Sequence, residues 1–238
     1  MKQLRSKKPL YAQIASIVKD RILHGVYPVG TNIPSEPQLE QEFQVSKVTV
    51  RNAIKELAQD GYVEKGSGKG TKVIRNTSAS KLSKLKRFTE VLVEDGHQIS
   101  KQLLFAENVI NDEGTTANQL FGERCLRVER LYHLNGEPYI HYTHYLSSRA
   151  SNIELSDLGA QSLYDLLDEQ RISISKYRDE FSVCATVQAY VTAALHIEAG
   201  TPLLKRSRYA YDESDELIEY SEGYYHTERH PYVVNYDV

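Results

Sequence analysis

The stretch EKGSGKGTKV, from Glu64 to Val73, sets lysines among glycines, a composition that suits a loop in contact with phosphate. A nucleotide-binding P-loop requires a glycine, four intervening residues and then Gly-Lys-Ser/Thr. Here Val63 stands at the first position and Gly70 at the last, so the P-loop pattern fails. The stretch instead suits a hairpin tip whose small residues let the backbone come close to a DNA phosphate.

A second candidate site lies in the run LRVERLY, whose alternation puts Leu126, Val128, Arg130 and Tyr132 on one face of a strand. An arginine among apolar neighbours needs a partner. Two explanations stay open. Arg130 forms an internal salt bridge, for example with Glu219, or its guanidinium binds the phosphate or carboxylate of a ligand.

Catalytic and metal chemistry have little support in this sequence. The chain contains neither GxSxG nor HExxH, and Cys125 and Cys184 fit free thiols in a reducing compartment. The alternating histidines His133, His141 and His144 leave a metal site open, but we favour ordinary core or surface histidines. We therefore expect no catalytic residue, no metal and no cofactor.

Three helices and a hairpin are predicted ahead of the second candidate site. Ser35 with Gln38 forms a capping box, and Ser46 caps a third helix after a turn of only three residues. So short a connection indicates a helix-turn-helix, and two β-prone runs around the glycine-rich tip add a wing. The first helix has its apolar stripe at Leu10, Ile14, Ile17, Val18 and Ile22, and the third at Val50, Ala53, Ile54 and Leu57.

The charge distribution supports a nucleic-acid partner for this first part. The outer stripe of the third helix is Lys47, Arg51 and Lys55. Residues 1–87 carry 17 Lys and Arg against 7 Asp and Glu, whereas residues 88–238 carry 12 against 25. A basic head on an acidic body is typical of a head that binds a polyanion. No apolar run is long enough to span a membrane, and we expect a cytoplasmic protein.

The second half predicts an α+β domain built on an antiparallel sheet. Two alternating runs flank Asn135-Gly136, a strong hairpin signal, and another pair flanks the acidic turn of residues 213–216. Residues 162–170 and 186–200 have helical patterns. The polar stretch RNTSASKLSK fits a linker. We expect a head at 1–74, a linker at 75–86 and a second domain at 87–238.

Together, PLYAQIASIVKDRILHGVYPVGTNIPSE, VSKVTVRNAIKELAQDGYVEKGSGKGTKV and the NGEP hairpin resemble the GntR family of bacterial transcription regulators. The later part resembles the HutC subfamily, whose UTRA effector domain is similar in fold to chorismate lyase. The resemblance implies that the start of the third helix enters the major groove and that the wing reaches the minor groove or its phosphates. In such a docking Arg51 suits guanine.

The resemblance, with the caps and flanking polar residues, gives a DNA-contacting set of Ser35, Ser46, Lys47, Thr49, Arg51, Asn52, Gly68, Lys69 and Gly70. The family commonly has Arg after PSE, where this chain has Pro37. That difference predicts a changed operator preference.

For the effector, sugar-phosphate-sensing relatives imply that the position of Arg130 binds phosphate with the start of a helix at RFTE, and that Glu219 and Tyr225 hold sugar hydroxyls. The expected set is Phe88, Thr89, Glu90, Arg130, Tyr132, Tyr142, Ser162, Tyr164, Glu219 and Tyr225. Relatives often have Glu in place of Tyr142, which leaves the ligand open between a sugar phosphate and a carboxylate metabolite.

The sequence therefore predicts a homodimeric, effector-controlled regulator, a repressor, that binds a pseudo-palindromic double-stranded DNA operator. Two alternatives remain: a lyase-like enzyme, and an architectural DNA-binding protein without a ligand. The effector would change the spacing of the two heads, with the linker as the moving part.

Overall fold

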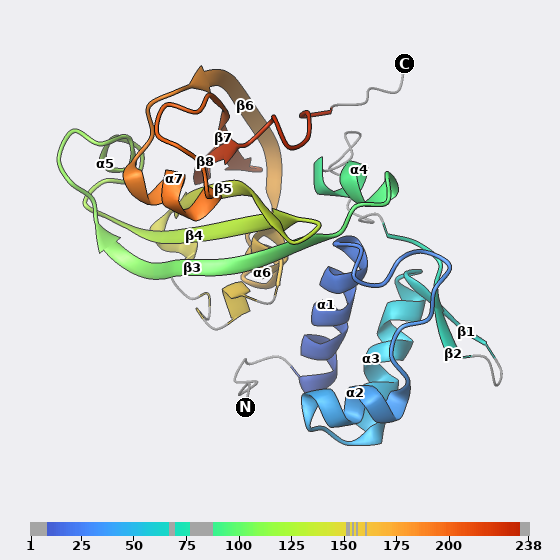
Figure 1. Cartoon of the computed structure of the whole chain (residues 1–238). Coiled ribbons are helices and arrows are strands. Elements are labelled where there is room, and N and C mark those ends of the chain that lie inside the picture. Colours follow the sequence, from blue (N-terminus) through green and yellow to red (C-terminus); the bar gives the residue numbers. More distant parts are fainter. Residues whose placement is uncertain are drawn as a thin grey trace, which may run out of the picture. The chain divides into compact units, whose positions relative to one another are not determined.

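The structure is a computed structural model that describes residues 9–66, 70–76, 88–150, 153, 155, 157–159 and 161–233. The described residues through Ile99 form one compact unit, and those from Ser100 onward form another (Figure 1). The first unit holds α1 (Leu10–Leu23), α2 (Glu36–Phe43), α3 (Lys47–Gln59), β1 (Val63–Gly66), β2 (Gly70–Val73) and α4 (Phe88–Glu94).

The core of the first unit forms where the predicted apolar stripes meet. Ile14, Val18 and Ile22 of α1 are buried, and so are all four predicted positions of α3. Leu39 of α2 joins them at 1% exposure. The three predicted helices are confirmed. Truncating one such core leucine to alanine costs roughly 2–5 kcal/mol of stability.

Local caps fix the ends of these helices. The backbone N–H of Ser35 donates to Gln38 Oε1 at 2.8 Å, which is half of the predicted capping box. Gln44 turns the chain after α2 with a left-handed backbone, and the hydroxyl of Ser46 accepts from the Thr49 N–H at 3.3 Å. This three-residue turn places α3 against α2 and α1, as a helix-turn-helix requires.

The hairpin of β1 and β2 is antiparallel, with Val63 opposite Val73 and Gly66 opposite Gly70. Both valines are buried in the helical core, which anchors the base of the hairpin. Gly70 has φ +86°, and a Cβ there would lie 2.9 Å from Asn32 Nδ2. The left-handed backbone at this position therefore favours glycine.

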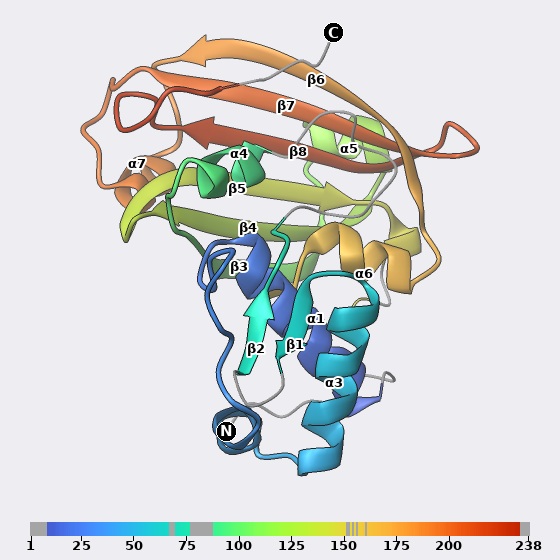
Figure 2. The same cartoon turned by 90° about the vertical axis from the view of Figure 1, so that its right-hand side faces the viewer.

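The second unit is built on one six-stranded sheet in the order β3-β4-β5-β8-β7-β6 (Figure 2). The pairs β4–β5, β5–β8, β8–β7 and β7–β6 are antiparallel. The strands are β3 (Ile99–Ile110), β4 (Arg124–Leu134), β5 (Glu137–Leu146), β6 (Ile174–Cys184), β7 (Leu203–Asp212) and β8 (Leu217–Tyr225). The α+β class is confirmed.

Both predicted hairpins are present. Asn135 and Gly136 both have positive φ, +52° and +91°. The two-residue turn between β4 and β5 therefore has the backbone of a type I′ turn, which hairpins favour. The strands β3 and β6 and the helix α5 (Thr116–Phe121) are not predicted from the sequence. Both of these strands lie at sheet edges, where charged residues interrupt the apolar alternation.

Short helices cover opposite faces of the sheet (Figure 1). Leu163, Leu166 and Leu167 of α6 (Leu163–Glu169) pack with Leu126 and Val128, on the face that carries Arg130. Val191 and Leu195 of α7 (Ala189–Leu195) pack with Leu131, Leu203 and Tyr224 of the other face. Two short 3₁₀ turns, Ser148–Ala150 and Asp157–Gly159, precede α6.

Candidate nucleic-acid interface and effector site

The outward face of α3 presents the predicted DNA-contacting residues to solvent. Ser46, Lys47, Arg51 and Asn52 are exposed, and Thr49 is half-buried beside the Ser46 cap. Val48, which the sequence reasoning did not select, is 65% exposed on the same helix. An exposed methyl-bearing side chain in a basic surface can contact the methyl group of thymine. The available signal in the sequence was a valine next to Lys47 and outside the apolar stripe of this helix.

A carboxylate links α3 to the hairpin. Glu36 Oε2 accepts from Arg51 Nε at 2.9 Å, and Glu36 Oε1 accepts from Lys65 Nζ at 2.8 Å. The Lys65 ammonium and the Arg51 guanidinium hold the pKa of Glu36 below its ordinary value. The Nη groups of Arg51 have no hydrogen-bond partner among the described residues, and these are the groups that form a bidentate contact with guanine.

The other predicted positions of the head lie at the start of α2 and at the hairpin tip. Ser35 is exposed at the start of α2, and Pro37 occupies the first turn of that helix, where a missing N–H costs no hydrogen bond. Gly68 and Lys69 lie outside the described residues, so their roles stay predictions.

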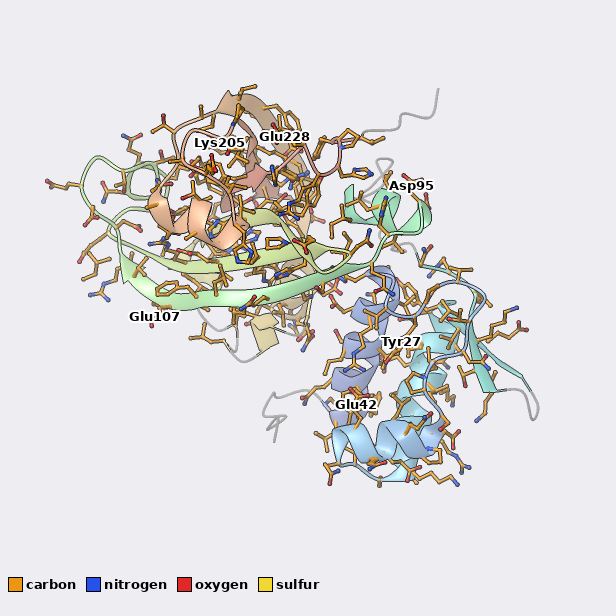
Figure 3. All side chains as sticks on the ribbon, in the orientation of Figure 1. Tyr27, Glu42, Asp95, Glu107, Lys205 and Glu228 are labelled. Carbon is orange, nitrogen blue, oxygen red and sulfur yellow. The ribbon has the colours of Figure 1, made fainter. Side chains whose placement is uncertain are left out.

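A separate contact joins two helices of the head. Arg21 of α1 donates hydrogen bonds to the Tyr27 hydroxyl and to Glu42 of α2, both labelled in Figure 3, and so ties α1 to α2.

The second unit brings one cross-strand row together. Arg130 pairs with Tyr142, Tyr142 with Gly223, and Gly223 with Arg206. Partners in antiparallel register lie on the same face. We call this the Arg130 row. The predicted sharing of a face by Leu126, Val128, Arg130 and Tyr132 agrees with this register, and Arg130 is only 2% exposed.

Arg130 has no carboxylate partner among the described residues. Its Nη2 donates to the backbone carbonyls of Leu158 at 2.6 Å and Gln161 at 3.3 Å, and its buried Nε has no partner. The internal salt bridge with Glu219 is therefore absent. Ser162 directly follows Gln161 and occupies the N-cap position of α6.

Glu219 instead forms the centre of a buried network. Its Oε1 accepts from His144 Nδ1 at 2.7 Å, and its Oε2 accepts from the Tyr164 hydroxyl at 2.9 Å. Burial alone would raise the pKa of Glu219, but the His144 hydrogen bond and further donors bring it below its ordinary value. Burial lowers the pKa of His144, so the imidazole is neutral.

The tautomer of His144 follows from this network. Nδ1 faces an ionised carboxylate and must carry the proton, which leaves Nε2 with a lone pair. Nε2 is buried and has no partner. His144 is therefore a hydrogen-bond acceptor of the kind that a ligand hydroxyl would satisfy. From the sequence, this histidine is predicted only as a metal ligand or as an ordinary core or surface histidine.

Tyrosine hydroxyls surround the other arginine of the row. The hydroxyls of Tyr142 and Tyr225 share a hydrogen bond, and Arg206 donates to Tyr142 and, at 3.1 Å, to Tyr232. Burial raises the pKa of Tyr142 and of Tyr225, so these hydroxyls are neutral at pH 7. Tyr132 packs edge-on against Tyr142 with ring centroids 5.7 Å apart.

Seven of the ten predicted effector residues thus belong to one contiguous set: Arg130, Tyr132, Tyr142, Ser162, Tyr164, Glu219 and Tyr225. For Phe88, Thr89 and Glu90 the structure gives the helical backbone of α4, and their side chains lie outside the described residues. Arg206 and Arg208 were missed, although their two-residue spacing on a predicted strand was the available signal.

Histidines do not converge on a metal in the described part of the chain, where no group of three His, Cys, Asp or Glu could hold one. His141 and His144 are three residues apart on β5 and so point to opposite faces. His141 lies 3.7 Å from Glu129, on the face away from the Arg130 row. No described helix is long and apolar enough to cross a bilayer.

Comparison with known families matches two segments. Residues 10–73 match the family described as "Bacterial regulatory proteins, gntR family", and residues 94–231 match the "UTRA domain". The two matches cover the helix-turn-helix with its hairpin and the unit that holds the Arg130 row.

Two relatives that are named as repressors align with more than nine-tenths of this chain. The "Probable fructoselysine utilization operon transcriptional repressor" of Escherichia coli K12 is 28% identical over 222 residues, covering 91% of this chain and 90% of that protein. The "HTH-type transcriptional repressor NagR" of Bacillus subtilis is 26% identical, covering 96% and 95%.

A solved structure, PhnF from Mycobacterium smegmatis, shares the fold with a TM-score of 0.53 at 24% identity, covering 90% of this chain and 95% of that one. The two family matches and the fold agree with the geometry of the two units. The chain therefore belongs to the GntR family and is a transcription regulator with a UTRA effector domain.

Proposed function

We propose that this regulator is a repressor that binds a pseudo-palindromic operator as a homodimer and is released by a small effector. Two of the relatives carry the name repressor. The head is assigned to residues 1–74, the linker to 75–86 and the effector and dimerisation domain to 87–238. The linker, the proposed moving part, lies largely outside the described residues. The protein acts where the chromosome is, in the cytoplasm.

In this proposal α3 reads bases and the flanking groups hold phosphates. Arg51 contacts guanine through its Nη groups, while Ser35, Ser46, Lys47, Thr49 and Asn52 hold or flank the DNA backbone. Gly70, together with Gly68 and Lys69, brings the wing to the minor groove or its phosphates. The support is the exposure of the described members on one surface of a helix-turn-helix.

The effector is proposed to be a sugar phosphate. The observation that carries this proposal is Arg130, a buried guanidinium without a described acid partner, on the same sheet face as the acceptors Glu219 and His144. A phosphate would compensate the guanidinium, and sugar hydroxyls would donate to the acceptors. The relative from Escherichia coli is named for the use of a sugar derivative, fructoselysine.

Calorimetry tests this effector class. Hexose 6-phosphates, their parent sugars and small carboxylic acids would be titrated into the wild type and Arg130→Ala. We expect a phosphosugar to bind, its parent sugar to bind far more weakly, and Arg130→Ala to remove most of that difference. Arg124→Ala is a matched control, since Arg124 lies on the same strand with its side chain 67% exposed. Binding of carboxylic acids alone would favour the carboxylate metabolite instead.

A further inference from the structure

A second buried guanidinium lies at the far end of the Arg130 row. Arg206 is 8% exposed, and its Nε is buried without a partner. Its described hydrogen-bond acceptors are the hydroxyls of Tyr142 and Tyr232. These are neutral groups, so the charge of Arg206 has no counter-charge in hydrogen-bond contact among the described residues.

The nearby carboxylates are already engaged. Asp179 accepts two hydrogen bonds of 2.7 Å from Arg208, an arrangement that satisfies both groups. Glu219 is held by His144 and Tyr164. In register, Glu219 is four residues from Gly223 on β8, which separates their backbones by about 13 Å along the strand. Arg206 is therefore a different case from Arg208, two residues away.

The row itself has the form of a two-ended site. Arg130 and Arg206 are separated by three strand spacings, about 14 Å between their backbones. Between them the Tyr142 ring lies over the bare backbone of Gly223, and the Arg206 guanidinium lies 5.4 Å from the centre of that ring. Both cations are thus on one face, at opposite ends of a row that includes the hydroxyl of Tyr142.

One anion cannot serve both ends. Burying a charge without a partner is costly, and a phosphate bound to Arg130 would leave Arg206 uncompensated. His144, two residues from Tyr142 on β5 and on the same face, has a buried Nε2 without a partner that suits a ligand hydroxyl group. We infer that the effector carries two anionic groups joined by a hydroxyl-bearing chain, with Arg130 binding one and Arg206 the other. This inference rests on the proposed sugar-phosphate effector and specifies its second end.

The experiment compares probes with one and two anions. Glucose 6-phosphate has one, glucose 1,6-bisphosphate has two phosphates, and 6-phosphogluconate has a phosphate and a carboxylate. Calorimetry on the full-length wild type is expected to give at least one two-anion probe an affinity about 10-fold or more above that of glucose 6-phosphate, because a charge-assisted bond is gained. The better of the two identifies phosphate or carboxylate as the second group.

Variants assign the gain to Arg206. Arg206→Gln is expected to bring the affinity ratio close to one without weakening glucose 6-phosphate, whereas Arg130→Gln weakens every probe. Arg206→Lys keeps the positive charge and is expected to retain part of the higher affinity for the two-anion probe. Arg178→Gln is the control, since Arg178 lies on the neighbouring strand β6 with its side chain 63% exposed.

A stability measurement separates a ligand site from a structural cation. Arg206→Met is expected to raise the melting temperature without ligand, since an uncompensated buried charge is removed, and to lose the extra stabilisation by the two-anion probe. Two results together would make Arg206 a structural residue. Arg206→Met would lower the melting temperature, and Arg206→Lys would show the same ratio of two-anion to one-anion affinity as Arg206→Gln. If glucose 6-phosphate binds and neither two-anion probe binds more tightly, the second anion is disproved and the proposed function stands. If no phosphorylated probe binds, both fail.

Discussion

At the scale of single residues, the direction of a guanidinium decides what it can read. Arg51 is held at its Nε by Glu36, which also binds Lys65 of the hairpin. A guanidinium that is held at its Nε still presents its Nη donors in one plane. Guanine O6 and N7 accept hydrogen bonds from two donors in such a plane. In the proposed docking, Glu36 therefore positions Arg51 for base reading.

Glu36→Gln tests this positioning role. Affinity for random DNA should rise, because a negative charge near the phosphates is lost, while preference for the operator guanine should fall. Fluorescence anisotropy would compare a selected operator, the same operator with that guanine replaced, and random DNA. An equal change in affinity for all three would show that Glu36 contributes charge alone.

Arg51→Ala should weaken operator binding by roughly 1–3 kcal/mol and relax the base choice at one position. Far-UV circular dichroism should stay unchanged, since Arg51 lies on the exposed stripe. Lys55→Ala, one turn further along the same stripe, is the control and should not alter base choice. Equal loss on operator and random DNA would make Arg51 a phosphate contact.

At the scale of elements, β8 contributes a glycine that makes room for a ring on β5 as well as side chains of the proposed effector site. A Cβ on Gly223 would lie 2.4 Å from Cε1 of Tyr142, so the ring on β5 rests over the bare backbone of β8. The same strand supplies Glu219 and Tyr225. The small residue and the large ring are therefore a matched pair across β5 and β8.

Gly223→Ala should destabilise the protein by about 1–3 kcal/mol through overpacking. Combined with Tyr142→Ala, its cost should largely vanish, because the clashing ring is gone. Gly159→Ala is the control, since its Cβ would meet only an ordinary contact at 3.8 Å. Chemical denaturation measures each variant, and additive costs in the double variant would contradict this account.

The pairing of β5 with β8 also gives a pH dependence through His144. Its pKa is lowered in the fold, so the unfolded chain binds more protons as the pH falls below about 6.5. This contribution to stability is present above that pH and is lost as the pH falls through the folded pKa, by at most about 1.4 kcal/mol per pH unit.

His144→Asn keeps a side-chain donor near Glu219 but does not titrate. Urea unfolding between pH 7.5 and 5 should therefore give a shallower fall in the free energy of unfolding for the variant than for the wild type. Parallel curves would mean that His144 does not change its protonation between the folded and unfolded states.

At the scale of the whole molecule, the proposed repression depends on two heads binding together. Half-sites recognised by a symmetric dimer lie a whole number of helical turns apart. An effector that prefers one arrangement of the heads then lowers operator affinity by its differential affinity for that arrangement.

Inserting about half a helical turn, roughly 5 base pairs, between the half-sites should reduce affinity to that of a single half-site. Gel-shift titration measures this loss, and sedimentation confirms the dimer. Insertion of a full turn is the control and should restore part of the affinity. Equal binding to both spacings would show that the heads bind independently.

The sequence alone determined the features that depend on near neighbours in the chain. The stripes of α1 and α3, the caps at Ser35 and Ser46, and the Asn135-Gly136 turn follow from residues a few positions apart. The placement of Arg130 on a buried strand face is of the same kind. Each rests on helical or strand periodicity, which neighbouring residues set by themselves.

Tertiary structure alone decided which side chains meet. The order β4-β5-β8-β7 pairs β8 with β5, which lies far from it in the chain. This pairing aligns Arg206 with Arg130 and gives Glu219 to His144 instead of Arg130. Such contacts arise from the pairing and register of distant strands. A strand's periodicity fixes which residues share its face, but only the assembled sheet determines their neighbours across it.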